Sequence, residues 1–336
     1  GEFVDLKLPA GKGTAQRAVI MLKRAAAIKK FVKEHNICTA YSFTHAPNEA
    51  LALSGAKCVK YISCRDYVRL IKSSKLYSFA LRHGCNVLFN ALEMQKKCEE
   101  MFPGNEDKLF TAYNIIDCEK AREDAKEELD EEYKEFYDTH RVIAFSSRFV
   151  DQKCQWDMLK SFELLKKDIP DAGLIFLGCR GEYENAVREM AKKSEYSGDI
   201  VFAGFQKNVF KFVSRADVFA MTSYYEGFPN VIVEALAVGT PAVSTDCTSG
   251  PAEVLASGRP FLPHCDKMTK VDCGILCPVM SESPDINDAH REYAKALKTL
   301  LTDGELRARL SENGKKRADE LSAENMKQVY FDLSDN

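Results

Sequence analysis

The chain has 336 residues, of which 45% are hydrophobic and 29% are charged, and its formal net charge is −3. This length suits two domains, and this composition indicates a globular protein with an ample core. The sequence has no run of eighteen or more apolar residues, so we expect no membrane-spanning helix. It also lacks a charged start followed by an apolar stretch and a small-residue cleavage site, so we expect no signal peptide.

Charge is spread unevenly along the chain. Residues 1–110 hold 18 Lys and Arg against 10 Asp and Glu, a net charge of +8, which leaves −11 on the remainder. A basic first part predicts an anionic partner, such as phosphate groups or the inner face of a membrane on which the protein is peripheral. Ordinary solvated helix faces explain the same charges equally well. Nucleic acid is not expected, because the basic residues are not interleaved with aromatic ones.

The twelve cysteines contain no Cys-x-x-Cys pair, and most lie singly in apolar or strand-like contexts. This usage indicates reduced thiols and a cytoplasmic protein. Cys265, Cys273 and Cys277 lie near His264, but their spacing matches no zinc pattern. The sequence therefore predicts no metal site and no cofactor.

The first part of the chain alternates between helix and strand patterns. A basic amphipathic helix is expected first, and strands and helices follow it in turn. In chain order these are a helix at 14–35, a strand at 36–43, a helix at 46–55, a strand at 57–64, a helix at 68–82, a strand at 85–90 and a helix at 91–101. Such alternation predicts an α/β domain with a parallel sheet over residues 1–118. Residues 119–138 are densely charged and are expected to be a linker.

The alternation resumes more clearly in a second Rossmann-like domain, expected over residues 139–318. The expected strands are 141–147, 172–178, 199–204, 217–223, 240–246 and 273–279, and the expected helices are 155–167, 182–194, 208–216, 229–238 and 251–258. Three more helices are expected at 286–302, 304–312 and 315–332, and residues 319–336 are expected to cross back to the first domain. The fold class is therefore α/β with two Rossmann-like domains.

The segment YYEGFPNVIVEALAVGTP, residues 224–241, places two glutamates eight positions apart around an apolar run. Ligands of doubly wound sheets bind beyond the carboxyl ends of the strands, where the loop after strand 217–223 would lie. Pro229 suits the first turn of the following helix, and Gly239 suits its end. Glu226 and Glu234 could then accept hydrogen bonds from the hydroxyls of one ligand. A capping role for Glu226 and a salt bridge for Glu234 would explain the same pattern.

Two further segments lead to the same edge of the predicted sheet. Ser249-Gly250-Pro251 opens a helix with Glu253 in its first turn, so two helix N-termini would favour a diphosphate there. SSRFVDQK, residues 146–153, brings Arg148 and Lys153, whose cationic side chains suit phosphate oxygens. An ordinary capped helix and ordinary surface charge are the alternatives.

With these motifs the chain resembles the retaining GT-B glycosyltransferases of family 4. The likeness is strong over about 140–280, through SSRFVDQK, LIFLG, VFAGF, the glutamate block, TDCTSGPAEVL and DCGILCPV. It is weaker over 35–118, through SFTHAPNEALAL, VKYISCRD and AYNIID. The resemblance implies that Arg148 and Lys153 bind the donor diphosphate, that Glu226 contacts the donor sugar and that Glu234 contacts the ribose. It adds to the donor site the backbone of Gly178, Gly227, Phe228, Pro229 and Asn230.

The resemblance implies transfer of a sugar from a nucleotide sugar, most often UDP-linked, to a glycan or polyprenyl-linked acceptor with retention. The TDCTSGP form is similar to enzymes of bacterial surface polysaccharide synthesis. No Asp-x-Asp occurs, so the metal motif of the other large glycosyltransferase fold is absent. Fixed cations and helix N-termini would then stabilise the departing diphosphate. The leaving phosphate itself would help to deprotonate the acceptor.

The chain also departs from this family. The opening strand and Gly-rich loop that normally face the diphosphate are not seen, so the first domain is expected to be incomplete. At the strand ends of that domain, His45 and Arg65 are the candidates for an acceptor or catalytic role. The alternative function is a non-catalytic nucleotide-sugar-binding or assembly module.

Overall fold

The computed structural model describes residues 13–257, 264–280 and 285–335. Within these residues the chain forms two compact units. Unit 1 runs to Tyr113 and takes in the residues from Gln328 onward, and unit 2 runs from Asn114 to Lys327. Each unit has its own parallel sheet and its own core, as the alternating pattern predicts.

Unit 1 contains a four-stranded parallel sheet in the order β1-β2-β3-β4. Its elements are α1 (Thr14–Glu34), β1 (Thr39–Ser42), α2 (His45–Leu53), β2 (Val59–Cys64), α3 (Tyr67–Lys72), α4 (Ser74–Arg82), β3 (Asn86–Phe89), α5 (Leu92–Met101) and β4 (Leu109–Thr111). The helix expected at 68–82 is divided at Ser73. Strand β4 was not predicted, because three residues are too few to show a strand pattern.

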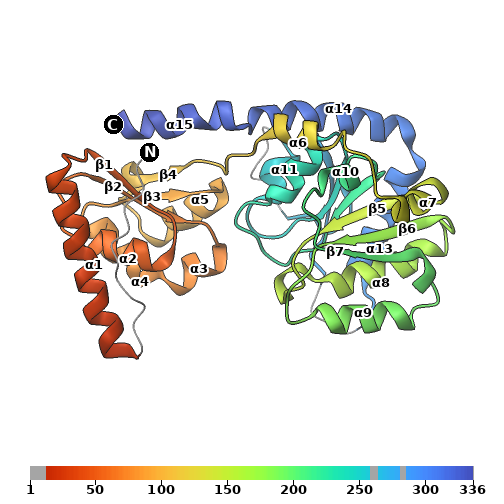
Figure 1. The fold of residues 1–336 in the computed structure, drawn as a ribbon, viewed down its shortest axis with the longest axis horizontal. Helices are drawn as coiled ribbons and strands as arrows, with labels where there is room; N and C mark the ends of the chain where they lie inside the picture. Colours follow the sequence, from red (N-terminus) through yellow and green to blue (C-terminus); the bar gives the residue numbers. More distant parts are fainter. Residues whose placement is uncertain (1–12, 258–263, 281–284, 336) are drawn as a thin grey trace. The chain divides into compact units, whose positions relative to one another are not determined.

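Unit 2 contains a seven-stranded sheet in the order β10-β11-β9-β8-β5-β6-β7, parallel except for β10. The strands are β5 (Arg141–Ser146), β6 (Ala172–Leu177), β7 (Ile200–Gly204), β8 (Val218–Met221), β9 (Ala242–Thr245), β10 (Thr269–Lys270) and β11 (Gly274–Cys277). The helices between and after them are α8 (Gln155–Lys166), α9 (Glu184–Lys193), α10 (Phe210–Val213), α11 (Asn230–Ala237), α12 (Pro251–Leu255) and α13 (Asp288–Thr302). Figure 1 shows α8, α9 and α13 on one face of this sheet and α10 and α11 on the other.

The order of these strands fixes where a ligand can bind. Strand β5 pairs with β6 on one side and with β8 on the other, with Ile143 opposite Val218. From β5 the chain continues to β6 and β7 on one side, and from β8 it continues to β9 and β11 on the other. The connections that follow β5 and β8 therefore run to opposite sides of the sheet. Open α/β sheets bind their ligands at the point where this reversal occurs.

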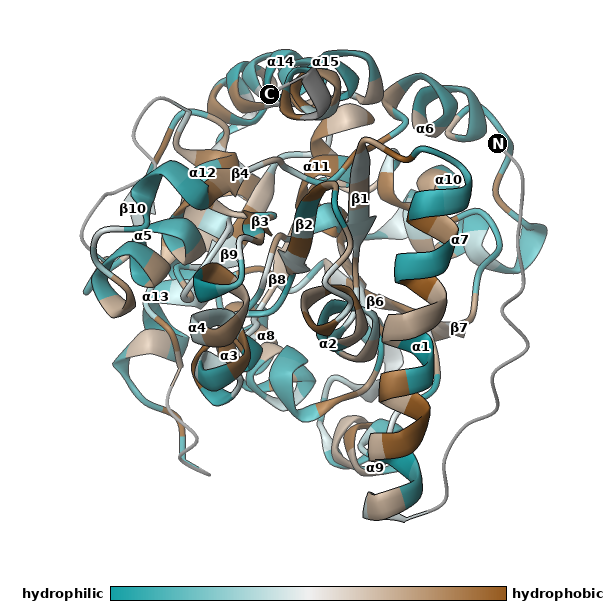
Figure 2. Cartoon of the chain, turned by 90° about the vertical axis from the view of Figure 1, so that its left-hand side faces the viewer, coloured by the Kyte–Doolittle hydropathy of each residue, from teal (hydrophilic) through white to brown (hydrophobic). Residues whose placement is uncertain are grey.

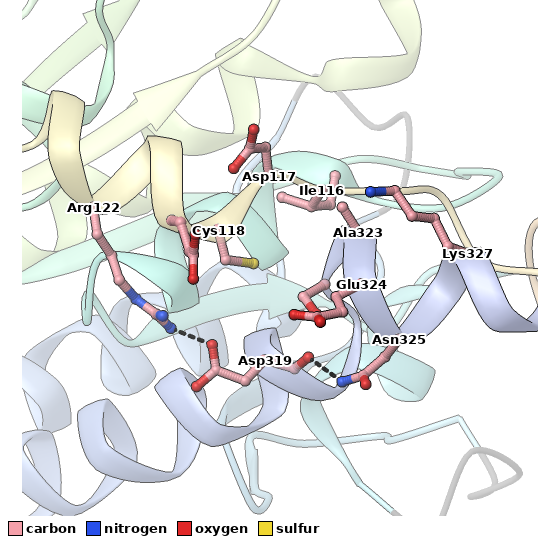
Figure 3. A pocket seen from close by; sticks show the side chains of 11 residues that line it. Ile116, Asp117, Cys118, Arg122, Asp319, Ala323, Glu324, Asn325 and Lys327 are labelled. Carbon is pink, nitrogen blue, oxygen red and sulfur yellow. Dashed lines mark hydrogen bonds and ion pairs between the residues drawn. The ribbon is translucent and has the colours of Figure 1, made fainter.

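The charged segment expected as a linker at 119–138 is largely helical and belongs to unit 2. Helices α6 (Cys118–Asp124) and α7 (Glu131–Thr139) lie in it. Arg122 Nε donates to Ala237 O at 3.0 Å, and the Tyr137 hydroxyl donates to Phe212 O at 3.0 Å. Figure 3 shows Arg122 directed at Asp319, with Asp319 in turn contacting Asn325. These hydrogen bonds and the buried side chains of Ala121 and Leu129 dock the segment on unit 2. The boundary between the units falls at residue 113 rather than 118.

The last two helices also divide at a different place from the predicted one. Helix α14 (Gly304–Glu320) runs through the predicted break at 313–314, and α15 (Ala323–Asp335) follows it. Glycine at 314 reads as a helix end in the sequence. In the structure a Cβ there would lie 2.8 Å from Leu236 Cδ2, so Gly314 allows α14 to pack closely on α11. The crossing to unit 1 accordingly comes at residue 328 rather than 319.

Helix α1 lies on the surface of unit 1, and Figure 2 shows both hydrophobic and hydrophilic faces on it. Its side chains Val19 and Leu22 are 52% and 63% exposed. Basic residues are frequent along this helix, and Glu34 is its single acidic residue. Among the described residues no helix has the length and apolar character needed to cross a bilayer.

Candidate functional site

The loop after β5 supplies the first part of the site. Arg148 is exposed, and its guanidinium has no partner among the described residues. Its backbone is fixed, because the buried Gln155 donates from Nε2 to Arg148 O at 2.7 Å. Phe149 is buried beside it and anchors the loop in the core. The cation predicted to bind phosphate therefore extends into solvent from a well-held backbone.

The loop after β8 meets this first loop through an ion pair. Lys153 Nζ lies 2.5 Å from Glu226 Oε1, and the two side chains are only 16% and 8% exposed. The Glu226 N–H donates to Thr248 O at 3.1 Å, which fixes the glutamate against the loop after β9. These two residues are 73 positions apart, and sequence analysis predicted a role for each without predicting that they pair.

The resemblance assigns the backbone of Gly227–Asn230 to the donor site, but this segment does not offer a free N–H group at every position. Pro229 has no N–H, and the Asn230 N–H donates to Phe228 O at 3.0 Å. Helix α11 begins at Asn230, and its N-terminal cap is Pro229 rather than Glu226. The tight turn before the helix uses the Asn230 donor internally. The alternative of a capping role for Glu226 is therefore wrong.

The helix starts expected at the two motifs lie close together. The Ser249 hydroxyl donates to Gly227 O at 2.8 Å. Gly250 has φ of +101°, and a Cβ there would lie 2.4 Å from Pro229 Cδ. Helix α12 begins at Pro251 and is five residues long, and its Glu253 is only 2% exposed. The structure thus places both motifs at one edge of the sheet.

Glu234 lies in the second turn of α11 and is half-buried. It lines a narrow pocket with Ser146, at the end of β5, and with Phe210. Its carboxylate has no hydrogen-bonding or ionic partner among the described residues, so the alternative of a salt bridge is wrong. Burial raises the pKa of Glu234 above its ordinary value. A desolvated carboxylate without a partner is costly, and such groups are frequent at binding sites.

Gly178 directly follows β6, at a point where its backbone touches the loop after β5. Its φ is +129°, and a Cβ would lie 2.2 Å from Ser147 O, a backbone atom that cannot move aside. We expect Gly178→Ala to lower the free energy of unfolding by roughly 1–3 kcal/mol or more, through strain and this clash. Thermal unfolding of the purified variant measures the change. Gly198→Ala is the matched control, because nothing lies within 4 Å of its added methyl group. Equal stability of both variants would contradict the prediction.

The two candidates of unit 1 lie at strand ends of that unit. His45 opens α2, with Nδ1 3.4 Å from Glu49 Oε1 and Nε2 3.4 Å from the Ser73 hydroxyl. The Arg65 guanidinium lies 5.7 Å from the ring centre of Phe43 and also contacts Tyr330. These contacts give both side chains local partners in unit 1.

Sequence analysis missed several polar residues that shape the site. Gln152 Nε2 donates to Tyr225 O at 2.6 Å, and the Thr222 hydroxyl donates to Lys153 O at 2.9 Å. Gln155 Oε1 and Ser223 Oγ are buried at this edge and have no partner among the described residues. Buried polar atoms of this kind are rarely left unpaired, and a bound ligand or water would satisfy them. Glutamines at a helix start and a serine at a strand end give no signal in a single sequence.

Together these side chains form a site with a free guanidinium, a Lys–Glu pair and a half-buried carboxylate at the carboxyl ends of β5 and β8. Cations suit phosphate oxygens, and carboxylates suit ligand hydroxyls. The arrangement fits a ligand that combines a phosphate group with sugar hydroxyls.

Comparison with known proteins agrees with this chemistry. An uncharacterized glycosyltransferase of Methanocaldococcus jannaschii is 28% identical over 256 residues, which cover 74% of this chain and 63% of that protein. The lipopolysaccharide core biosynthesis glycosyltransferase LpsE of Rhizobium meliloti is 31% identical over 173 residues, 52% of this chain and 43% of that protein. The chain thus spans less than two thirds of the length of these relatives.

Solved structures show the same fold at low sequence identity. A glycosyltransferase from Rickettsia africae has a TM-score of 0.75 at 15% identity, covering 96% of this chain and 83% of that one. Anabaena HepE in complex with UDP has a TM-score of 0.73 at 18% identity, covering 93% of this chain and 82% of that one. The fold therefore resembles that of GT-B glycosyltransferases. The family described as glycosyl transferases group 1 matches residues 126–317. Since these residues make up more than half of the chain and contain both loops of the site, the chain belongs to the glycosyl transferases group 1 family.

Proposed function

We propose that this protein transfers a sugar from a nucleotide sugar, a UDP-sugar above all, to a glycan or lipid-linked acceptor with retention and without a metal ion. The observation that carries the proposal is the unpartnered, half-buried carboxylate of Glu234 on α11, the helix that follows the loop of the Lys153–Glu226 pair. In this proposal Arg148 and Lys153 bind the diphosphate, Glu226 contacts the donor sugar and Glu234 accepts hydrogen bonds from the ribose hydroxyls. The glutamate pair would place the enzyme in family 4.

The chemistry follows from these roles. The bond between the anomeric carbon and the diphosphate oxygen breaks, and negative charge develops on the leaving phosphate. Arg148 and Lys153 would stabilise that charge more strongly than they stabilise the bound donor. The acceptor hydroxyl attacks from the same face and gives its proton to the leaving phosphate. This route needs no base–nucleophile pair in the protein and retains the anomeric configuration. His45 or Arg65 would act on the acceptor side.

Two observations support the proposed acceptor class. LpsE is named for lipopolysaccharide core synthesis, and a Campylobacter jejuni relative, 25% identical over 230 residues, acts on a diphospho-undecaprenol substrate by its name. Helix α1 also presents the exposed Val19 and Leu22 among basic side chains. A basic amphipathic helix favours the surface of an anionic membrane. We therefore propose a peripheral, cytoplasmic position for the enzyme.

Calorimetric titration with UDP in EDTA tests the donor site. We expect UDP to bind without metal, because fixed cations supply the charge that a metal would otherwise supply. GDP is the comparison ligand, and UDP-sugars follow. Binding of UDP-sugars without transfer to any acceptor would favour the alternative of a non-catalytic binding or assembly module. If neither UDP nor GDP binds, the proposed donor site is wrong.

A further inference from the structure

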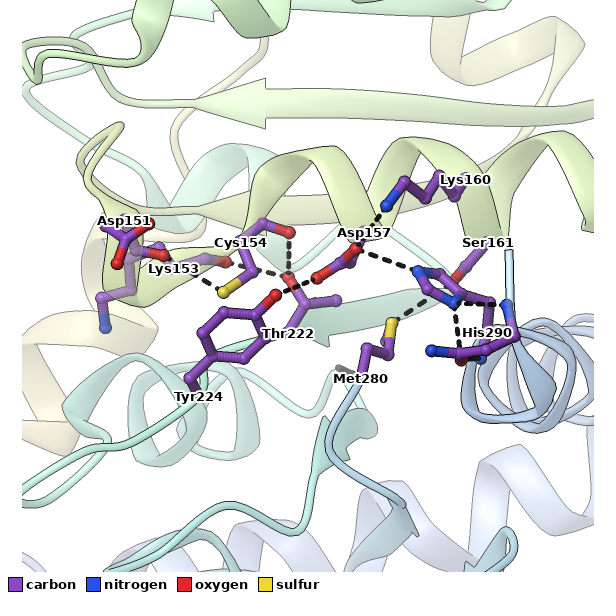
Figure 4. A network of polar contacts seen from close by, with 11 residues as sticks. Asp151, Lys153, Cys154, Asp157, Lys160, Ser161, Thr222, Tyr224, Met280 and His290 are labelled. Atoms are coloured by element: carbon purple, nitrogen blue, oxygen red, sulfur yellow. Dashed lines mark hydrogen bonds and ion pairs between the residues drawn. The ribbon is translucent and has the colours of Figure 1, made fainter. Parts of the chain in front are cut away.

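A buried polar cluster lies next to the loop that holds Lys153 (Figure 4). Its centre is Asp157, which is fully buried in the first turn of α8. Asp157 Oδ1 lies 2.9 Å from His290 Nε2 and 3.1 Å from Lys160 Nζ, and Oδ2 accepts a hydrogen bond from the Tyr224 hydroxyl at 2.9 Å. His290 is also fully buried, at the start of α13. The cluster therefore joins three segments that are far apart in the sequence.

Each hydrogen-bonding partner in the cluster has a defined role. His290 Nδ1 lies 3.1 Å from the Asn287 backbone nitrogen and 2.8 Å from Asn287 Oδ1, so Asn287 holds the ring with Nε2 toward Asp157. Burial raises the pKa of Tyr224, so its hydroxyl stays protonated and donates to the carboxylate. Lys160 supplies a positive charge next to Asp157. The carboxylate thus accepts from donors on both of its oxygens.

The cluster is connected to the site through the backbone of two loops. The Tyr224 N–H donates to Gln152 O at 3.0 Å, next to Lys153. Tyr224 itself is two residues before Glu226. The hydrogen bond from Tyr224 to Asp157 therefore fixes the loop that carries Glu226 against α8. The loop that carries Lys153 leads directly into that helix. Cys154, between Lys153 and the start of α8, has φ of +50°. A non-glycine residue keeps this conformation only when its surroundings impose it.

Stability alone does not explain a cluster of this kind. A buried ion pair seldom stabilises a fold more than apolar side chains of the same volume would, because both charges lose their hydration. What fixed hydrogen bonds add is one defined geometry. We infer that Tyr224, Asp157 and His290 are positioning residues that set the geometry of the Lys153–Glu226 pair. The link from this geometry to donor binding rests on the function proposed above.

The Tyr224→Phe variant tests the inference, because it removes only the hydroxyl that contacts Asp157. Tyr293→Phe is the matched control. Tyr293 is fully buried, whereas Tyr224 is half-buried, and the Tyr293 hydroxyl bonds the strand backbone at Met221 and Val243 rather than the site loops. Both variants are expected to lose similar thermal stability. A purely structural role for Tyr224 would therefore leave them alike in every other property.

Two readouts separate the inference from the proposed function. The first is the ¹³C signal of the Glu226 carboxyl in the ligand-free protein, assigned by its loss in Glu226→Gln. We expect Tyr224→Phe, and His290→Gln at the far side of Asp157, to move this signal, and Tyr293→Phe to leave it in place. An unmoved signal in Tyr224→Phe would overturn the positioning role.

The second readout is the dissociation constant for UDP. We expect Tyr224→Phe to raise it about fivefold to tenfold, since part of a hydrogen bond to a charged group is lost, and Tyr293→Phe to change it less than twofold. A parent protein that fails to bind UDP would overturn the proposed function, while the carboxyl signal would still decide the positioning role. A parent that binds UDP with an affinity unaffected by Tyr224→Phe would overturn the link between the cluster and donor binding.

Discussion

Replacing Lys153 with methionine is expected to lower the rate of sugar transfer by roughly 100-fold or more, the usual effect of removing one group that stabilises charge in the transition state. The methylene stem of the side chain is kept, and only the ammonium is lost. That ammonium lies at the ligand edge of β5 and is paired to Glu226 at 2.5 Å. Steady-state kinetics with a UDP-sugar and an acceptor measure the change. Lys298→Met is the control, because Lys298 is also paired, to Asp168 at 3.0 Å, but is exposed.

The Lys153→Met variant also leaves Glu226 almost buried without its partner, so a loss of stability could imitate a loss of function. The double variant Lys153→Met, Glu226→Leu separates the two effects. Removing both charges is expected to restore stability, since neither group then stays buried and unpaired. It is not expected to restore transfer. Recovery of transfer in the double variant would show that the pair has only a structural role.

Replacing Glu234 with glutamine is expected to stabilise the ligand-free protein and to weaken UDP binding about tenfold or more. Burial raises the pKa of Glu234, so the charged form is disfavoured in the folded state. Both states are protonated well below the ordinary pKa of glutamate, and the folded state loses stability as the pH rises through its raised pKa. At neutral pH glutamine avoids that cost. Glutamine is also a weaker acceptor than a carboxylate, whose hydrogen bonds contribute about 1.5–3 kcal/mol.

Thermal unfolding at neutral pH and near pH 4, with calorimetric titration at neutral pH, checks both halves of this prediction. The gain in stability from Glu234→Gln should be largest at neutral pH and should shrink as the pH falls toward the ordinary pKa of glutamate. Glu189→Gln on α9 serves as the control, because the Glu189 side chain is exposed and pairs with Lys192. A Glu234→Gln protein that is less stable and binds UDP normally would contradict the assignment of Glu234 to the ribose.

The sequence was sufficient to predict that the loops after strands 141–147 and 217–223 reach one edge of the sheet, because the ends of strands follow from period and spacing. Lys153 and Glu226 end neighbouring strand–loop units, so their approach follows once β5 and β8 are adjacent. The contact between Asp157 and His290 joins residues 133 positions apart on two helices, and no local pattern indicates it. The break predicted between helices 304–312 and 315–332 was wrong for the same reason, since the role of Gly314 depends on Leu236 of another helix. Local patterns predict elements and their ends, whereas pairings of buried side chains depend on tertiary packing.

The division of the chain has a consequence for the order in which the protein forms during synthesis. Unit 2 is one uninterrupted stretch from Asn114 to Lys327, whereas unit 1 needs the residues from Gln328 onward. The Tyr61 hydroxyl donates to Leu333 O at 2.8 Å, and the Tyr41 hydroxyl contacts Tyr330 O at 3.3 Å. Domains fold as units as they leave the ribosome. Unit 2, which holds Lys153, Glu226 and Glu234, can therefore complete its sheet before the last turns of α15 are made. Unit 1 is translated before unit 2 begins but is completed after it.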